Sequence, residues 1–361
     1  MSIEPDRRAA LLAAKLGALA RAHFGDVHGD AVSGAFPGGA TLVEPDGGRA
    51  WVYVGVDAPW RVGAALAVAA RTRPSELHLL VDPNETGEAG SATAASKAAR
   101  AGAHPAEVAA RRAALFADAP QVWAVEGAEL RRAAPAAPAT DPAPAPEAEL
   151  YRPVLEAAGL DAIAEGGHLL GELRGLEVAR VVVGDDGAAH VEAGVGRFDR
   201  EIASMMFAHL GETDALARAI DLVAEHRTAD AARHPINQLV PERWLRWVLI
   251  ERPELVGASA LRAVGSALPR TSLREVGVAS AVGTDLAGQP LVVTCSTGVD
   301  LELVPSAADD RLAHAPDARL VLVVPARDSL PVTTRLASRL LAPAEVVEVA
   351  DDWRTLGELD R

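Results

Sequence analysis

The hydrophobic residues of this chain gather in short runs that are separated by polar turns. The run "ARLVLVVP" from Ala318 does not alternate between apolar and polar positions. Unbroken apolar runs of this length are typical of strands that are covered on both faces. The pattern therefore predicts layered α/β structure, with helices packed on both sides of a sheet.

Three stretches share one order of elements: a turn, an apolar strand, a Gly-Val pair and a polar start to a helix. They read "GGRAWVYVGVDAPWRVGAALAVA", "GAAHVEAGVGRFDREIASMM" and "GQPLVVTCSTGVDLELVPSAADD", with the pairs beginning at Gly55, Gly194 and Gly298. In the first and third stretches, the next strand starts 22 residues after the glycine, at Leu77 and Leu320. This shared spacing predicts an internal repeat, with the middle copy the least regular.

Each of these stretches follows a segment with a helical pattern, and these segments are Ala9–His23, Leu150–Ile163 and Pro241–Val256. The sequence thus predicts an α/β protein with three related helix-strand-helix-strand units around mixed central sheets. A further helical segment follows the middle unit. Its last helix begins at Pro241, since proline suits a first helical position, and Trp244 and Trp247 contribute to its apolar side.

The predicted domains follow from changes in composition. Residues 131–148 are rich in Ala and Pro, and proline without a period is typical of an extended linker. We expect an N-terminal unit over 1–130, with a small and polar insertion at about 84–102. The middle unit with its helical segment covers 149–255, and the C-terminal unit covers 256–361.

Charge limits the classes of partner. The net charge is −15, and nucleic-acid binding depends on Lys and Arg that neutralise phosphates. The charge therefore disfavours an extensive nucleic-acid interface, although it does not exclude a local nucleic-acid-binding patch. No segment reaches the roughly 18 apolar residues of a spanning helix, so we expect no membrane partner. The chain's start lacks the order of a signal peptide and Cys295 is the single cysteine, so we expect a cytoplasmic protein.

The basic residues are almost all arginine. Only Lys15 and Lys97 are lysines among the 35 Lys and Arg residues. Arginine and alanine have GC-rich codons, and in this respect the chain resembles an actinobacterial protein.

In the third unit, the helix "ERWLRWVLIERPELVG" precedes the strand "GQPLVVTCSTG" after a variable stretch. This order resembles the core of the PD-(D/E)xK restriction-endonuclease-like superfamily. The resemblance implies that Glu and Asp hold Mg²⁺ on a helix and two strands, and that a Lys two residues after the last acid helps to activate water. Oxygen ligands suit a hard metal ion that polarises phosphate.

The outer units depart from that motif. The positions of its last acid and its lysine hold Thr294 and Ser296 in the third unit, and Tyr53 and Gly55 in the first. None of these side chains replaces a carboxylate ligand or a lysine. The resemblance therefore implies no metal site in either outer unit.

The middle unit keeps two carboxylates at matching positions, Glu177 in "GLEVARV" and Glu192 in "VEAG". Gly194 stands where the family has lysine. Together with Arg197 and Asp199 in "VGRFDREI", these glutamates form a candidate site for a metal ion or a partner. The structural alternative, which we favour, is a solvated corner in which Asp199 lies against the dipole of a helix N-terminus.

A second polar cluster lies in "RHPINQLVPERW" and offers His234, Asn237 and Arg243 as candidate ligand-binding residues. The same residues suit a turn at Pro235 followed by a helix that starts with proline. We favour the structural interpretation.

The sequence therefore favours a non-catalytic binding or assembly module. We expect it to have no cofactor and to bind a protein partner of unknown identity. The alternative is a metal-dependent nuclease or phosphodiesterase centred on the middle unit, which would use Mg²⁺ or Mn²⁺. The loss of the motif lysine from every unit favours the first hypothesis.

Overall fold

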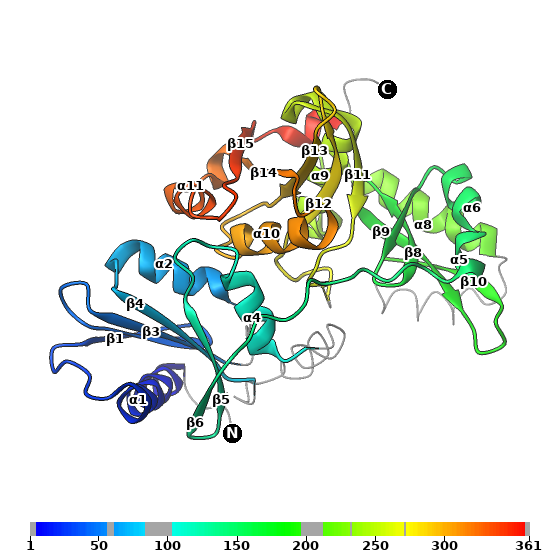
Figure 1. The fold of residues 1–361 in the computed structure, drawn as a ribbon. Coiled ribbons are helices and arrows are strands. Elements are labelled where there is room, and N and C mark those ends of the chain that lie inside the picture. The colour runs from blue at the N-terminus through cyan, green and yellow to red at the C-terminus, as the bar shows by residue number, and fades with distance from the viewer. Residues whose placement is uncertain are drawn as a thin grey trace. The chain divides into compact units, whose positions relative to one another are not determined.

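A computed structural model shows an α/β protein with three sheets of six, four and five strands (Figure 1). The structure describes residues 5–55, 61–83, 103–195, 212–231, 233–270 and 272–357. The chain divides into two compact bodies. The first body consists of Met1–Ala139, Leu301–Asp309 and Leu330–Glu345, and the second consists of Thr140–Asp300, Asp310–Ser329 and Val346–Arg361.

The N-terminal sheet lies in the first body and has the order β1-β2-β3-β4-β5-β6. Its strands are β1 (Val32–Phe36), β2 (Gly39–Val43), β3 (Arg49–Val54), β4 (Glu76–Val81), β5 (Gln121–Glu126) and β6 (Glu129–Arg132). Strands β1 to β3 form an antiparallel meander, β3 to β5 are parallel, and β6 returns antiparallel. The prediction of a mixed sheet is confirmed for this unit.

Helices cover this sheet on both faces, as its apolar runs predicted. The described helices of the first body are α1 (Pro5–Phe24), α2 (Val62–Thr72), α4 (Pro105–Ala113) and α11 (Pro331–Ala337). In α1, Leu12, Leu16 and Leu19 share one face and pack against Trp51 and Tyr53 of β3. Each buried leucine stabilises the fold by roughly 1.5–3 kcal/mol. Helices α2 and α4 contact β3, β4 and β5.

The middle sheet is antiparallel throughout, so the mixed sheet predicted for the middle unit is wrong. Its order is β10-β9-β8-β7, and the strands are β7 (Asp161–Glu165), β8 (His168–Leu173), β9 (Leu176–Val183) and β10 (Ala189–Ala193). Gly166 and Gly167 join β7 to β8, and Arg174 and Gly175 join β8 to β9, all four with positive φ. Two-residue turns of this kind connect antiparallel neighbours, whereas parallel strands need a long crossover.

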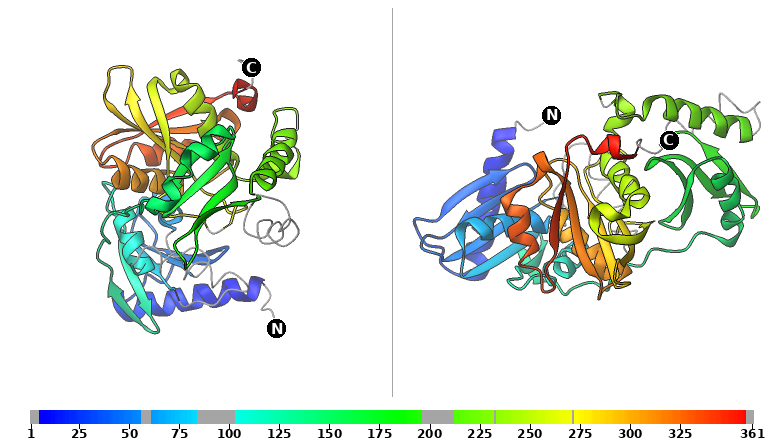
Figure 2. Two further views of the ribbon diagram at one scale, coloured as in Figure 1. Left: turned by 90° about the vertical axis from the view of Figure 1, so that its right-hand side faces the viewer. Right: turned by 90° about the horizontal axis from the view of Figure 1, so that it is seen from above.

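Short helices and one longer helix cover the middle sheet. They are α5 (Pro146–Glu149), α6 (Arg152–Ala157) and α8 (Glu212–His226). The helix predicted over Leu150–Ile163 is shorter than expected, because Gly159 has a φ of 79° and β7 follows at once. Figure 2 shows α8 beside the sheet, and α8 contacts β8, β9 and β10.

The C-terminal sheet has the order β11-β12-β13-β14-β15. Its strands are β11 (Ala258–Val264), β12 (Ala279–Asp285), β13 (Pro290–Cys295), β14 (Arg319–Pro325) and β15 (Glu345–Val349). The remaining helices are α9 (Pro241–Glu251) and α10 (Leu303–His314), with 3₁₀ turns η1 (Pro235–Gln238), η2 (Pro253–Val256), η3 (Ala326–Asp328) and η4 (Trp353–Gly357). Strands β11 to β13 are antiparallel, and β14 is parallel to β13.

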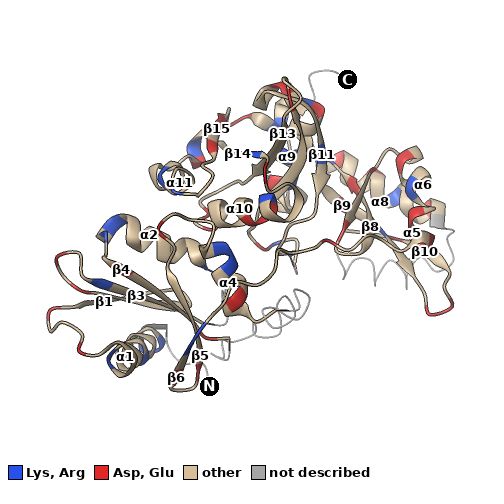
Figure 3. Ribbon diagram, viewed as in Figure 1, with Lys and Arg blue, Asp and Glu red and all other residues tan. Residues whose placement is uncertain are grey.

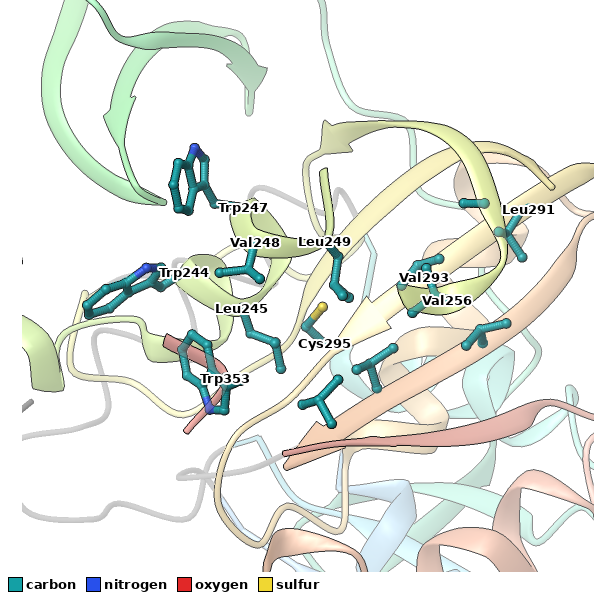
Figure 4. Packing of buried hydrophobic residues seen from close by; sticks show 14 residues of the cluster. Trp244, Leu245, Trp247, Val248, Leu249, Val256, Leu291, Val293, Cys295 and Trp353 are labelled. Carbon is teal, nitrogen blue, oxygen red and sulfur yellow. The ribbon is translucent and has the colours of Figure 1, made fainter. Parts of the chain in front are cut away.

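Helix α9 packs its apolar face on the C-terminal sheet (Figure 4). Leu245 and Leu249 lie next to Cys295, which ends β13 as a small buried strand residue. Burial raises the pKa of the Cys295 thiol, so the thiol stays protonated and inert. Trp244 meets Trp353 of η4 edge to face, with ring centroids 5.8 Å apart.

The N-terminal and C-terminal sheets share an order of elements. In each sheet a three-stranded antiparallel meander leads through one helix into a fourth strand that is parallel to the third. Leu77 and Leu320 are the second residues of these fourth strands. The two strands therefore occupy equivalent sheet positions, while descent from an internal repeat stays a prediction.

The predicted linker has no helix or strand from residue 133 to residue 145, and most of it is exposed. Hydrogen bonds hold it within each body. In the first body, the amide of Ala136 donates to the carbonyl of Glu107 over 2.9 Å. In the second body, Asp141 accepts from the amide of Gly166 over 2.6 Å. The predicted insertion at 84–102 lies outside the described residues, and the predicted domain limits stay predictions.

None of the helices in the described part of the chain is long and apolar enough to cross a bilayer.

We predict that elastase cuts the linker near Ala139, since this segment is exposed and lacks core residues. The two pieces should separate on a denaturing gel but elute together under native conditions. The reason is that 301–309 and 330–345 belong to the first body, where Arg111 pairs with Asp309 over 2.7 and 2.8 Å and Arg339 pairs with Asp118 over 2.7 Å. Native release of a free N-terminal piece would contradict this prediction.

Candidate functional site

A cluster of buried charged side chains lies in the second body and centres on Glu172 of β8. Its side chain is 1% exposed and lies between two arginines of α9. Arg243 donates to one carboxylate oxygen over 2.7 Å, and Arg246 donates to the other over 2.8 Å. Arg243 also donates to both oxygens of Glu165, at 2.7 Å each. We call these four residues the Glu172 network.

The turn between β8 and β9 brings the Glu172 network close to α9. Gly175 in this turn has a φ of 74°, which favours glycine. A Cβ atom there would lie 2.3 Å from the carbonyl oxygen of Arg243, so only glycine fits. The sheet therefore packs directly on the backbone of α9.

The charges in the network determine its protonation states. Burial alone would raise the pKa of Glu172, but the positive charges of Arg246 and Arg243 and their hydrogen bonds lower it below its ordinary value. Burial also disfavours the charged form of Arg243, yet Glu165 and Glu172 raise its pKa. The pKa shifts of Glu172 and Arg243 therefore both favour the charged form of the side chain.

A second buried ion pair involves the start of α9. Glu242 in the first turn of this helix pairs with Arg270. Burial lowers the pKa of Arg270, and Glu242 opposes that effect. A guanidinium in this setting still carries its charge at neutral pH, since arginine has the highest side-chain pKa.

Glu177 and Glu192, the two candidate metal ligands, have different surroundings. Glu177 on β9 is buried and accepts from Arg180 over 3.0 and 3.2 Å. Glu192 on β10 has a side chain that is 40% exposed and lies 3.9 Å from His190. In the strand register, Glu192 faces Arg180. An arginine therefore occupies the position between the two candidates.

The two other members of that candidate site, Arg197 and Asp199, lie outside the described residues.

The second candidate cluster is a loop between α8 and α9. His234 caps η1 by accepting from the amide of Ile236 over 3.3 Å. Its ring stacks on that of His226, with centroids 4.1 Å apart. The amide group of Asn237 donates to the carbonyls of His226, Thr228 and Ala231 over 2.9, 3.1 and 2.6 Å. His234 and Asn237 therefore stabilise the loop, while Arg243 belongs to the Glu172 network.

The same loop is fixed by a buried guanidinium. Arg227 donates to the carbonyls of Arg174, Ile236 and Leu239, and its guanidinium lies 4.8 Å from the ring centroid of Trp244. Burial lowers the pKa of Arg227 to about 9. Arg227 thus connects the loop to the turn after β8 and to Trp244 of α9.

Glu165, Glu172 and Arg246 match no motif in the sequence and are not among its candidate site residues. A usable signal was present in α9, where Arg243 and Arg246 are three residues apart beside core tryptophans. Residues three apart lie on one helix face, so two buried cations there require acidic partners. The identity of those partners depends on a tertiary contact that the sequence does not display.

The first body holds a different buried polar cluster at the carboxyl end of β4. Asp82 is 4% exposed, and one of its oxygens accepts from Tyr53 and from Lys15, both over 2.7 Å. Carboxyl ends of parallel strands commonly form ligand sites in α/β proteins. Here the lysine and the phenol neutralise and bond the carboxylate, as a buried acid requires.

A third cluster lies between β12, β13 and α10 in the second body. Asp310 accepts from the hydroxyl of Ser280 over 2.6 Å, and that hydroxyl also lies 2.8 Å from the hydroxyl of Thr294. The amide of Ala267 donates to the other carboxylate oxygen over 2.7 Å. Thr294, which stands at a motif position in the sequence, is therefore a buried hydrogen-bonding residue.

Among the residues that the structure describes, no three His, Cys, Asp or Glu side chains are grouped so as to hold a metal ion. In the comparisons with known proteins, no family model, no curated protein and no solved structure matches this chain.

We predict that Glu172→Gln lowers the free energy of unfolding by about 3–5 kcal/mol, because it leaves two buried arginines short of one negative charge. Glu192→Gln on the same sheet is the matched control. Its side chain is 40% exposed, so the change should stay within about 0.5 kcal/mol. Urea unfolding measures both values. Equal effects of the two substitutions would contradict the assignment of the network.

The Glu172 network also predicts an acid dependence. Since the pKa of Glu172 is lower in the folded protein, its contribution is complete above the unfolded value of about 4.3 and is lost as the pH falls through the folded pKa. The difference in stability between the wild type and Glu172→Gln should therefore shrink below about pH 4. Urea unfolding between neutral and acidic pH tests this, and a gap that widens in acid would disprove it.

Proposed function

We propose that this chain is a non-catalytic binding or assembly module. The observation that carries the proposal is the pairing of the buried carboxylates of the middle sheet with arginine. Glu172 has Arg243 and Arg246 at hydrogen-bonding distance, and Glu177 has Arg180. These acids act as partners in structural ion pairs.

A divalent metal ion would compete poorly for these carboxylates. Mg²⁺ requires several oxygen ligands at short distance, so the guanidinium groups would have to leave. Arg243 is buried, and an arginine that loses its acid in the interior remains charged and unpaired at a cost of about 3–5 kcal/mol. Occupation by arginine therefore favours a structural role for the middle sheet.

The resemblance to the PD-(D/E)xK superfamily contributes to the same proposal. Its lysine would stand at Gly194, and the chain's two lysines are Lys15 in α1 and Lys97, which lies outside the described residues. The equal order of elements in the N-terminal and C-terminal sheets supports the inference that they are degenerate copies of one unit. We further propose a cytoplasmic location, which the single buried Cys295 supports.

The alternative is a metal-dependent nuclease or phosphodiesterase centred on the middle unit. The partial exposure of Glu192 favours it, because an exposed carboxylate on an edge strand is accessible to an ion. For this function Glu177 would have to exchange Arg180 for the metal.

Thermal melting with Mg²⁺ or Mn²⁺ separates the two functions. We expect no metal-dependent rise in melting temperature for the wild type or for Glu192→Gln, and no cleavage of single-stranded or double-stranded DNA or RNA. A binding metal would stabilise the fold by roughly 2.7 kcal/mol at a hundredfold excess over its Kd. A rise of that size that disappears in Glu192→Gln would favour the nuclease.

A further inference from the structure

The edge strands of the three sheets differ in charge (Figure 3). Natural sheets protect an exposed edge with charged side chains, because its free backbone groups otherwise pair with another strand. Five edge strands in the described part of the chain carry charged or histidine side chains: β6 (Glu129, Arg131, Arg132), β7 (Asp161, Glu165), β10 (His190, Glu192), β11 (Arg262) and β15 (Glu345, Glu348). Strand β1, which reads "VSGAF", carries none.

Strand β1 is accessible along its outer side. Among the strands that the structure describes, it pairs with β2 alone, in a regular antiparallel register from Val32 to Phe36. Val32 is 69% exposed, and Ser33 and Ala35 are exposed as well. In an edge strand, every second residue directs both its N–H and its C=O outward. The outer side of β1 can therefore accept one further strand.

A shallow hollow of about 390 Å³ lies at the end of the sheet where β1 begins. The segment Asp26–His28 lines it together with Glu44 and Arg49. Arg49 donates to both oxygens of Glu44 and to the carbonyls of Phe24 and Asp26. Through these contacts Arg49 offsets the charge of Glu44. Asp26 therefore gives the lining an excess of negative charge.

Glu44 and Asp30 are the two further acids near this end of β1. The hydrogen bond from Arg49 lowers the pKa of Glu44 to about 2, against the opposing effect of burial. Asp30, which immediately precedes Ala31 and β1, has a side chain that is 88% exposed. An approaching ligand therefore meets acids at this end of β1 and a charge-free edge along its length.

We propose that β1 is the docking edge for an extended segment of a protein partner, which adds to the sheet as an antiparallel strand of about five uncharged residues and ends in a basic residue. Antiparallel pairing brings the residues that follow the docked strand to the hollow, where a Lys or Arg meets Asp26 and Asp30. Docking of this kind gains affinity from main-chain hydrogen bonds and specificity from alternate side chains. The inference rests on the proposed binding function and names the class of partner.

A peptide segment suits this edge better than a second copy of the chain. The edge is short, because five residues extend over roughly 17 Å. A stable dimer of folded copies needs a much larger contact, of about 1,200–2,000 Å² in total. Two copies would also each carry a net charge of −15 and repel one another. A segment with a basic residue is attracted by the same charge.

Fluorescence anisotropy of the full chain with two labelled peptides tests the proposal. The probes are Thr-Val-Thr-Val-Thr-Arg and its matched control Thr-Val-Thr-Val-Thr-Glu. We expect the arginine peptide to bind with a Kd below about 1 mM, and this Kd should be about tenfold lower than that of the control peptide. Ala35→Glu should abolish binding by charging the edge, whereas Ser33→Thr, which adds no charge, should preserve it. Asp30→Asn should weaken binding of the arginine peptide several-fold and should strengthen binding of the glutamate peptide, because it removes a charge that attracts the first and repels the second.

Hydrogen exchange locates the contact, since amides of β1 should gain protection when the arginine peptide is bound. Absence of binding by both peptides would overturn the inference, as would binding that survives Ala35→Glu. A dimer that forms with rising concentration and is lost in Ala35→Glu would identify a second copy as the occupant and would also overturn it. These failures are independent of the proposed function, which fails through metal-dependent stabilisation or nucleic-acid cleavage.

Discussion

The burial of Glu172 between Arg243 and Arg246 is the constraint on which the second body depends. A carboxylate that is 1% exposed is tolerated only if cations and hydrogen bonds replace its water. Both cations come from α9, so β8 and α9 are stable only in contact with each other. The exclusion of a side chain at Gly175 keeps that contact at backbone distance.

Helix α9 connects this polar contact to a core that contains Trp244, Trp247 and Trp353. Arg243 and Arg246 face the middle sheet, while Leu245 and Leu249 pack on β13 of the C-terminal sheet. Trp244 has apolar neighbours in the core and a charged neighbour, since the guanidinium of Arg227 is 4.8 Å from its ring. A change at α9 should therefore affect the middle sheet and the C-terminal sheet at once.

The same contacts limit the chemistry available in the middle sheet. General acids, bases and metal ligands need carboxylates whose charge or proton is free to change. Arginine fixes the charge of its partner because it stays protonated at all physiological pH values. Glu165, Glu172 and Glu177 all have such partners, which is the observation that supports the proposed binding module over a metal-dependent enzyme.

The sequence predicted what short-range patterns determine. Unbroken apolar runs gave the covered strands at Leu77 and Leu320, and the Pro241 start gave α9. The Gly166-Gly167 and Arg174-Gly175 turns indicate an antiparallel middle sheet. The resemblance of the three stretches to one another instead favoured the same mixed sheet in every unit. The Glu172 network could not, because its ion pairs join residues 71 and 74 positions apart in the chain.

Carbon NMR of the glutamate carboxyl groups, with the Glu172 signal assigned by its loss in Glu172→Gln, tests the central claim most directly. The account predicts that Glu172 stays ionised below its ordinary pKa of about 4.3, and that Mn²⁺ does not selectively broaden its signal or that of Glu177. Protonation of Glu172 at or above that value, or selective broadening of these signals by Mn²⁺, would contradict the account.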